Sequence, residues 1–129
     1  QELGTIAQEK AAVKIAVMNN SYLGMVRQWQ ELFYSRRYSG TYLSNPDFVK
    51  IAEAYGIPGL RVTQKELVRP AIQQAMDYDG SFLIDFVVEP EENVYPMVPP
   101  GAALSEVLEA PGKPGKVPTD SVALPVSNI

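Results

Sequence analysis

The sequence predicts an α/β fold, a partial doubly wound parallel sheet with helices on both faces. Mostly apolar, strand-like runs alternate with helical stretches in the order helix, strand, helix, helix, strand, helix, strand. The run AAVKIAVM at 11–18 is typical of a strand buried on both faces, and SFLIDFVVE at 81–89 is the clearest strand of the chain. Because doubly wound sheets usually have more strands than these, we expect others to precede residue 1.

The first elements follow from apolar spacing. Residues 1–10 predict the end of a helix, because apolar side chains recur at helical spacing. The pair Asn19-Asn20 follows the first strand, at the edge where open α/β sheets bind ligands. Residues 24–34 carry apolar side chains on one helical face, whereas 35–44 have no clear period and predict a loop.

Residues 45–56 predict the next helix. Asn45 is expected at its N-cap, Pro46 at its first helical position, and Gly56 as its C-terminal stop. A short strand is expected directly afterwards, at 60–62.

The last helix is expected to open with a capping box at 63–66 and to run to about residue 78. Pro70 lies inside it and should kink it or shorten its first part. Residues 105–109 favour one helical turn. The Pro- and Gly-rich stretch 111–129 predicts a disordered, flexible C-terminal tail, so the expected organisation is one domain portion over 1–110 followed by that tail.

The composition excludes several kinds of function. The 129 residues are 46% hydrophobic, and the net charge of −4 is interspersed, unlike the basic stripe that nucleic-acid binding needs. There is no Cys and no His, which excludes disulfides, thiolate metal sites and Ser-His triads. No apolar run is long enough to cross a bilayer, and residues 1–4 are unlike a signal peptide. Any chemistry is therefore expected to come from a bound cofactor.

The Asn pair has two interpretations. An Asn amide oxygen is a hard neutral ligand that suits Mg²⁺, and the start of the helix after Gly24 is a natural seat for phosphate oxygens. Alternatively, Asn19-Asn20 is a turn dipeptide that tolerates left-handed backbone angles. On the dipeptide alone, the turn is the preferred interpretation.

The apolar stripe of the helix at 24–34 also has two interpretations. It contains Met25, Val26, Trp29 and Phe33. Such spacing usually marks a face turned to the core, and that interpretation is preferred on the stripe alone. The alternative is an apolar wall over a cofactor or a substrate channel.

Three sets of charged residues complete the candidates. The Arg36-Arg37 pair is a possible anion site, with solvated surface preferred. Asp85 lies within the strand at 81–89 and is either buried and paired or at an edge. The acidic residues Glu89, Glu91 and Glu92 are expected in a solvated loop and not in a metal cluster.

Three long stretches resemble the large subunit of acetolactate synthase (acetohydroxyacid synthase). They are VKIAVMNNSYLGMVRQWQELFYSRRY at 13–38, NPDFVKIAEAYGIPGLRV at 45–62 and EENVYPMVPPGAAL at 91–104. Together the resemblance covers roughly residues 1–108, and the tail from Pro111 does not share it. It implies the C-terminal part of a thiamine-diphosphate-binding fold.

The resemblance implies a metal and cofactor site. Enzymes of this family share a motif that begins Gly-Asp-Gly and ends in an Asn pair; the ending is present and the beginning is expected just before Gln1. Asn20 is the implied side-chain ligand of Mg²⁺, and the main-chain carbonyl of Tyr22 is the next ligand. The implied thiamine diphosphate contacts are Asn20, Tyr22, Leu23, Gly24, Met25 and Val26, with Met25 beneath the folded cofactor.

The resemblance also implies a substrate channel that binds herbicides. Trp29 matches the family's Trp at this channel, which is implicated in preference for 2-ketobutyrate. Pro100 stands where other members have Ser, Gly or Ala. The implied channel residues are Met25, Val26, Trp29, Phe33 and Pro100.

The implied reaction joins hydroxyethyl-thiamine diphosphate, derived from pyruvate, to pyruvate or 2-ketobutyrate with release of carbon dioxide, in branched-chain amino-acid biosynthesis. The implied activating Glu comes from a partner subunit and FAD from a middle domain, so we expect no catalytic residue among these 129 and no synthase activity from them alone. Implied partners are further large subunits, as a dimer or tetramer, and a regulatory small subunit. The compartment would be the cytoplasm in bacteria, or the plastid in plants and algae.

Two alternatives stay open. One is another thiamine-diphosphate-dependent decarboxylase or oxidase, against which the run Met25 to Gln30 (MVRQWQ) argues. The other is a non-catalytic remnant domain that keeps the fold without the reaction.

Overall fold

Three parallel strands form the sheet, in the order β1-β3-β2. The computed structural model describes residues 1–109, and the strands are β1 (Lys14–Asn19), β2 (Gly59–Val62) and β3 (Phe82–Val87). Both outer strands pair with β3, which places Ile84 opposite residues of each neighbour. The predicted parallel sheet is therefore confirmed, and the tail expected at 111–129 lies outside the described residues.

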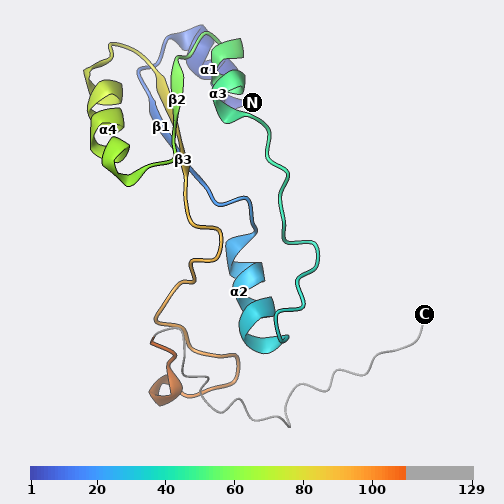
Figure 1. The fold of residues 1–129 in the computed structure, drawn as a ribbon. Helices are drawn as coiled ribbons and strands as arrows, with labels where there is room; N and C mark the ends of the chain where they lie inside the picture. Colours follow the sequence, from blue (N-terminus) through green and yellow to red (C-terminus); the bar gives the residue numbers. More distant parts are fainter. Residues whose placement is uncertain (110–129) are drawn as a thin grey trace, which may run out of the picture.

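Helices cover both faces of this sheet, as predicted (Figure 1). The helices α1 (Glu2–Glu9) and α3 (Phe48–Ala54) lie on one face, and α4 (Val68–Asp77) lies on the other. The remaining long helix, α2 (Gly24–Phe33), lies beyond the carboxyl end of the strands. Two 3₁₀ turns, η1 (Lys65–Leu67) and η2 (Leu104–Glu106), complete the described elements; no helix among them is long and apolar enough to span a membrane.

The core consists of two apolar layers separated by the sheet. On the α4 side, the buried side chains are Val62, Ala71, Ala75, Phe82, Ile84 and Phe86. On the α1 and α3 side, Leu83 packs with Ala52 and Ile57, and the half-buried side chains of both helices close over them. Five consecutive residues of β3 are buried because the strand is central and both of its faces are covered.

The prediction that the first strand is buried on both faces is wrong. In β1, Ala16 and Met18 are exposed, and 66% of the Met18 surface is accessible. They share the face on which α4 packs, but α4 packs mainly against β3 and β2. Among the described residues β1 pairs on one side only, so a buried-type sequence lies at a sheet edge.

Two predicted helix starts are also wrong. Asp47, and not Asn45, is the N-cap of α3, because its carboxylate accepts hydrogen bonds from the amides of Val49 (3.1 Å) and Lys50 (3.2 Å). The capping box expected at 63–66 does not form: the chain makes the turn η1, whose first residues carry no side-chain cap. Pro70 then lies in the first turn of α4, where its missing amide hydrogen costs no helical bond, which fits the expected shortening.

Asp85 is fully buried in the middle of β3 and is paired, which decides between its two interpretations. The Arg61 Nε donates to Asp85 Oδ2 at 2.8 Å from the neighbouring strand β2. The other end of the same guanidinium donates to Asp47 Oδ1 at 3.0 Å. One Arg thus links the central strand to the start of α3, and it neutralises a buried carboxylate.

We predict that Arg61→Met lowers the free energy of unfolding by about 2 kcal/mol or more, because it leaves the Asp85 carboxylate buried and unpaired. Urea denaturation of the 129-residue chain measures this loss. The matched double variant Arg61→Met/Asp85→Leu should recover most of it, since no buried charge remains. A single variant as stable as the unmodified chain would show that Asp85 does not need its partner.

Candidate functional site

The loop between β1 and α2, residues 20–23 (the Asn20 loop), is shaped by the Asn20 side chain. Its Oδ1 accepts a hydrogen bond from the Tyr22 amide at 3.1 Å, and the left-handed residue of the turn is Ser21, with φ of 57°. A Cβ atom at Gly24 would lie 3.1 Å from Asn20 Nδ2, which favours glycine there. Asn19 is still part of β1, and neither Asn has the left-handed backbone angles that the dipeptide tolerates. Asn20 does make the local side-chain turn that is typical of its residue type.

A second segment, residues 41–45, holds this loop from the side. The Leu23 amide donates to the Thr41 carbonyl and the Leu43 amide donates to the Ser21 carbonyl, both at 2.8 Å. Farther along, Asn45 Nδ2 donates to Asn19 Oδ1 at 3.0 Å. The Asn20 loop is therefore fixed by a short antiparallel bridge. This role was not predictable from the sequence, because residues 41–45 have no periodic pattern.

The oxygen atoms of the Asn20 loop and the amide hydrogens at the start of α2 fit a diphosphate with its Mg²⁺. Helix α2 begins at Gly24 without a side-chain cap, so the amide hydrogens of its first turn face outward from the helix end. No donor among the described residues reaches the Tyr22 main-chain oxygen. Asn20 and Tyr22 together offer neutral, hard oxygen atoms, a set that suits Mg²⁺ whose charge is balanced by phosphate oxygens.

Helix α2 buries its polar side and exposes its apolar side. Arg27 and Gln28 are each 1% exposed, whereas Met25 is 52% exposed and Val26 50%. Trp29, 39% exposed, packs edge-on against Phe33 with ring centroids 5.5 Å apart. The preferred interpretation of the stripe as a core-facing surface is wrong within residues 1–109. The stripe is an open apolar wall that begins at the Asn20 loop.

A buried ionic network holds the polar side of α2. Arg27 donates to Glu31 Oε2 at 3.0 Å and to Asn93 Oδ1 at 2.6 Å, and Asn93 Nδ2 donates to Glu31 Oε2 at 2.9 Å. The Arg27 guanidinium also lies 6.0 Å from the centroid of the Tyr22 ring. This network joins the residues after β3 to α2 and to the Asn20 loop.

The network sets the charge state of Glu31. Burial raises the pKa of this carboxyl, but the hydrogen bond from Asn93 and the positive charge of Arg27 outweigh it and hold the pKa below its usual value. Glu31 is therefore ionised at neutral pH and remains so into moderately acidic solution.

Among the described residues, no hydrogen bond or ring contact links Pro100 to Trp29. Pro100 is exposed on a turn that is closed by the Ala102 amide donating to the Pro99 carbonyl at 3.0 Å. The connection to α2 runs through Met97, whose Sδ accepts from Gln28 Nε2 at 3.2 Å. The predicted channel residues therefore lie on two separate structures, the α2 wall and this turn.

The remaining candidates are surface residues, as the sequence indicates. Arg36 and Arg37 are exposed, and Arg36 pairs with Glu31 at 3.2 Å. The acidic residues at 89, 91 and 92 are exposed, and residues 1–109 contain no group of three His, Cys, Asp or Glu side chains placed to hold a metal. A shallow polar cleft of about 260 Å³ lies beside the Asn20 loop and is lined mainly by polar side chains, among them Asn19, Ser21, Ser44, Asn45, Asp47 and Arg61.

Residues 1–86 match the model of the thiamine pyrophosphate enzyme C-terminal TPP binding domain. The chain belongs to this family, and the match includes the Asn20 loop and the whole of α2. Among solved structures, the thiamine diphosphate-dependent 4-hydroxybenzoylformate decarboxylase of Rhodococcus jostii RHA1 is similar, with a TM-score of 0.61 and 30% identity over 70% of this chain and 17% of that chain.

Within the family, this chain is similar to acetolactate synthase large subunits. It is 47% identical to the isozyme 2 large subunit of Escherichia coli (strain K12), over 84% of this chain and 20% of that protein. It is 43% identical to the chloroplastic acetolactate synthase 2 of Nicotiana tabacum, over 84% of this chain and 18% of that protein. The chain thus spans about a fifth of the length of these relatives. The resemblance inferred from the sequence is confirmed.

We predict that Glu31 makes the packing of α2 sensitive to acid. Its folded-state pKa is lowered, so the stability it contributes is complete above its ordinary pKa of 4.5 and is lost as the pH falls through the lower folded value. Trp29 is the single tryptophan of the sequence and reports on α2 by fluorescence. Thermal unfolding is followed by the fluorescence of Trp29. Between about pH 6 and pH 3, the melting temperature of Glu31→Gln should fall less than that of the unmodified chain. Identical pH dependence would remove Glu31 from the network.

Proposed function

We propose that residues 20–26 bind the Mg²⁺-diphosphate end of thiamine diphosphate and that the parent polypeptide is an acetolactate synthase large subunit. The observation that carries the proposal is the pairing of the Asn20 and Tyr22 oxygen atoms with the uncapped start of α2. Membership of the thiamine pyrophosphate family and the 41–47% identity to acetolactate synthases support it. The site residues themselves follow from resemblance and from this geometry.

Each residue of the loop has a distinct task in this proposal. Asn20 Oδ1 and the Tyr22 carbonyl hold Mg²⁺, while the amides at the start of α2 receive diphosphate oxygens. Gly24 allows the close approach, and Met25 supports the folded cofactor from below. When bound, the cofactor supplies the carbanion chemistry, which explains how a domain without His takes part in such a reaction.

The exposed stripe of α2 then becomes a wall of the substrate channel. Leaving Met25, Val26 and Trp29 open to water costs hydrophobic free energy, and a cofactor and substrate that cover them would recover it. Phe33 buttresses Trp29, and Pro100 contributes from the separate turn. The proposed reaction joins pyruvate to a second 2-ketoacid, pyruvate or 2-ketobutyrate, and releases carbon dioxide.

The rest of the machinery is proposed to lie elsewhere in the parent enzyme. An activating Glu would come from a partner large subunit, FAD from another domain, and regulation from a small subunit. A dimer or tetramer of large subunits fits the α2 wall, which is uncovered within residues 1–109, whereas the open edge of β1 is where the strands expected before residue 1 would pair. The similarity to the Rhodococcus jostii enzyme supports the alternative of a related decarboxylase. Its identity to this chain, 30%, is lower than the 47% of the Escherichia coli acetolactate synthase, so acetolactate synthase is the preferred proposal.

We predict that Asn20→Ala in the full parent polypeptide weakens Mg²⁺-dependent binding of thiamine diphosphate about tenfold or more, because it removes a metal ligand. Calorimetric titration with the cofactor at fixed Mg²⁺ measures this. Asn20→Asp keeps an oxygen ligand and should retain binding, and Gln73→Ala, which removes an exposed side-chain amide of α4, is the control. Unchanged affinity in Asn20→Ala would exclude Asn20 from the site.

We predict that Trp29→Leu changes the preference for 2-ketobutyrate and the affinity for herbicides while the cofactor stays bound. The reason is that Trp29 belongs to the open wall and makes no hydrogen bond to the Asn20 loop in residues 1–109. Competition between the two ketoacids in a product assay checks it. Tyr34→Leu, which removes an exposed aromatic at the end of the same helix, is the control and should leave the preference intact.

A further inference from the structure

The Gln28 side chain binds the main chain of the segment after β3. Its Nε2 donates to the Val94 carbonyl at 2.9 Å, and its Oε1 accepts from the Val94 amide at 2.8 Å. One amide group therefore satisfies both polar main-chain atoms of Val94, as a neighbouring strand would. Gln28 is 1% exposed, so these bonds are shielded from water and removing them would leave polar groups unpaired.

Gln28 also stands between the two separate parts of the proposed channel. In α2 it directly precedes Trp29, and its Nε2 contacts Met97 Sδ, two residues before the turn that begins at Pro99. Met97 is itself fixed by main-chain bonds to Leu108 at 2.9 and 2.7 Å. Gln28 therefore links α2, next to Trp29, to the segment that leads into the turn that carries Pro100.

The Arg27 network cannot set this spacing by itself. Arg27 and Glu31 hold Asn93 and the Glu91 carbonyl, which lie farther from the turn than Val94 and Met97 do. Their contacts anchor the start of the segment, whereas Gln28 holds the part that leads into the turn. The ionic network of Arg27 and Glu31 thus holds residues 91–93 against α2. The neutral Gln28 amide holds Val94 and Met97 in their positions along the helix.

We propose that Gln28 is a positioning residue that sets the distance between Trp29 and the turn 99–101 and thereby the choice of the second 2-ketoacid. The inference rests on the proposed function, because that function names the substrates. Gln28 touches neither substrate nor cofactor in this scheme. It acts on specificity through the two groups that it holds in place.

Gln30 provides a matched control on the other side of the same helix. Its Nε2 donates to the Ser39 carbonyl at 2.9 Å and its Oε1 accepts from the Ser39 amide at 3.1 Å. The side-chain amide pairs with a main-chain amide and carbonyl as at Gln28, but its bonds to Ser39 are exposed, its Oε1 also accepts from Thr41 Oγ1 at 3.3 Å, and the segment held is a different one. A loss of specificity that arose only from a weakened α2 would follow from either substitution, whereas the proposed spacing depends on Gln28 alone.

The test compares Gln28→Met, Gln28→Glu and Gln30→Met in the full parent polypeptide with Mg²⁺ and thiamine diphosphate. The ratio of kcat/KM for 2-ketobutyrate to that for pyruvate as second substrate should change about threefold or more in Gln28→Met, mainly through KM. Gln28→Glu keeps the acceptor for the Val94 amide but turns a carboxylate oxygen toward the Val94 carbonyl, so it should shift the ratio at least as much. Affinity for the cofactor should stay unchanged in both, and Gln30→Met should leave the ratio unaltered.

Two results would overturn the inference. One is an unchanged ratio in an active Gln28→Met enzyme, and the other is an equal shift in Gln30→Met. If Gln28→Met does not fold, the ratio in Gln28→Glu decides. A parent polypeptide that neither binds the cofactor nor makes acetolactate would instead refute the proposed function, and this inference with it.

Discussion

The burial of Arg27 and Gln28 against residues 91–97 decides which side of α2 remains open. A charged side chain and an amide can be buried here because nearly all of their polar atoms find partners in Glu31, Asn93 and the main chain of the segment. Only Arg27 Nε lacks one among the described residues. With its polar side fixed in this way, α2 turns Met25 and Trp29 outward, which reverses the usual orientation of an amphipathic helix.

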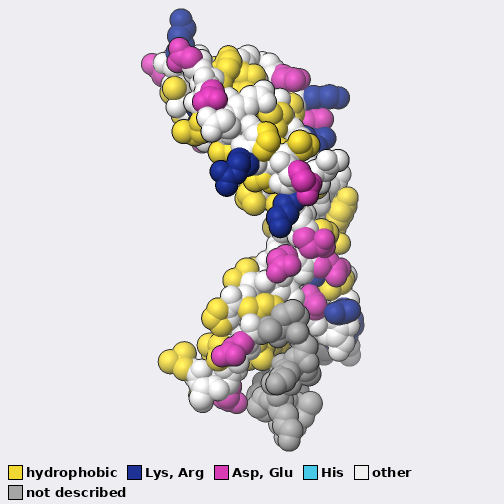
Figure 2. Space-filling model, turned by 60° about the vertical axis from the view of Figure 1, so that its left-hand side comes forward, with side chains coloured by type: hydrophobic (Ala, Val, Ile, Leu, Met, Phe, Trp, Pro, Cys, Tyr) yellow, Lys and Arg dark blue, Asp and Glu magenta, His cyan; other side chains and the backbone are white. Residues whose placement is uncertain are grey.

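The molecule consists of two parts, the sheet with the helices packed on it and the part around α2. The sheet with α1, α3 and α4 has an ordinary apolar core, whereas the part around α2 is held by hydrogen bonds and ion pairs. The two parts meet at a narrow waist below the carboxyl ends of the strands (Figure 2). The Asn20 loop connects β1 to α2, so the proposed metal ligands lie between the sheet and the part around α2 (Figure 1).

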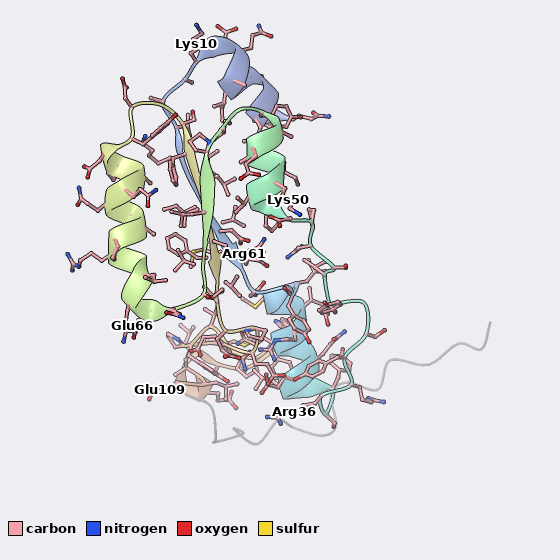
Figure 3. The ribbon with its side chains drawn as sticks, turned by 45° about the horizontal axis from the view of Figure 1, so that its top comes forward. Lys10, Arg36, Lys50, Arg61, Glu66 and Glu109 are labelled. Carbon is pink, nitrogen blue, oxygen red and sulfur yellow. The ribbon has the colours of Figure 1, made fainter. Side chains whose placement is uncertain are left out.

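A buried ion pair also lies within the sheet, where the Asp85 carboxylate pairs with Arg61. Arg61 reaches from the edge strand β2 toward the start of α3, beside the carboxyl end of the sheet (Figure 3). Its bonds to Asp85 and Asp47 hold that helix against the sheet near Asn45, which in turn supports Asn19. A buried ion pair in the core is thereby linked through one short loop to the residue before the proposed ligand Asn20.

The sequence by itself determined the order of elements, the parallel sheet, the family and the position of the Asn pair, because strand and helix periods and long matched stretches are local properties of the chain. Only the tertiary structure decided that Asp47 caps α3, that β1 is an edge strand here, and that Gln28 binds the main chain of Val94. Those features depend on partners far along the chain, and a helical period shows which residues share a face but not which face is covered. For that reason the apolar stripe of α2 predicted a core contact, and its true orientation followed from Arg27 and Gln28.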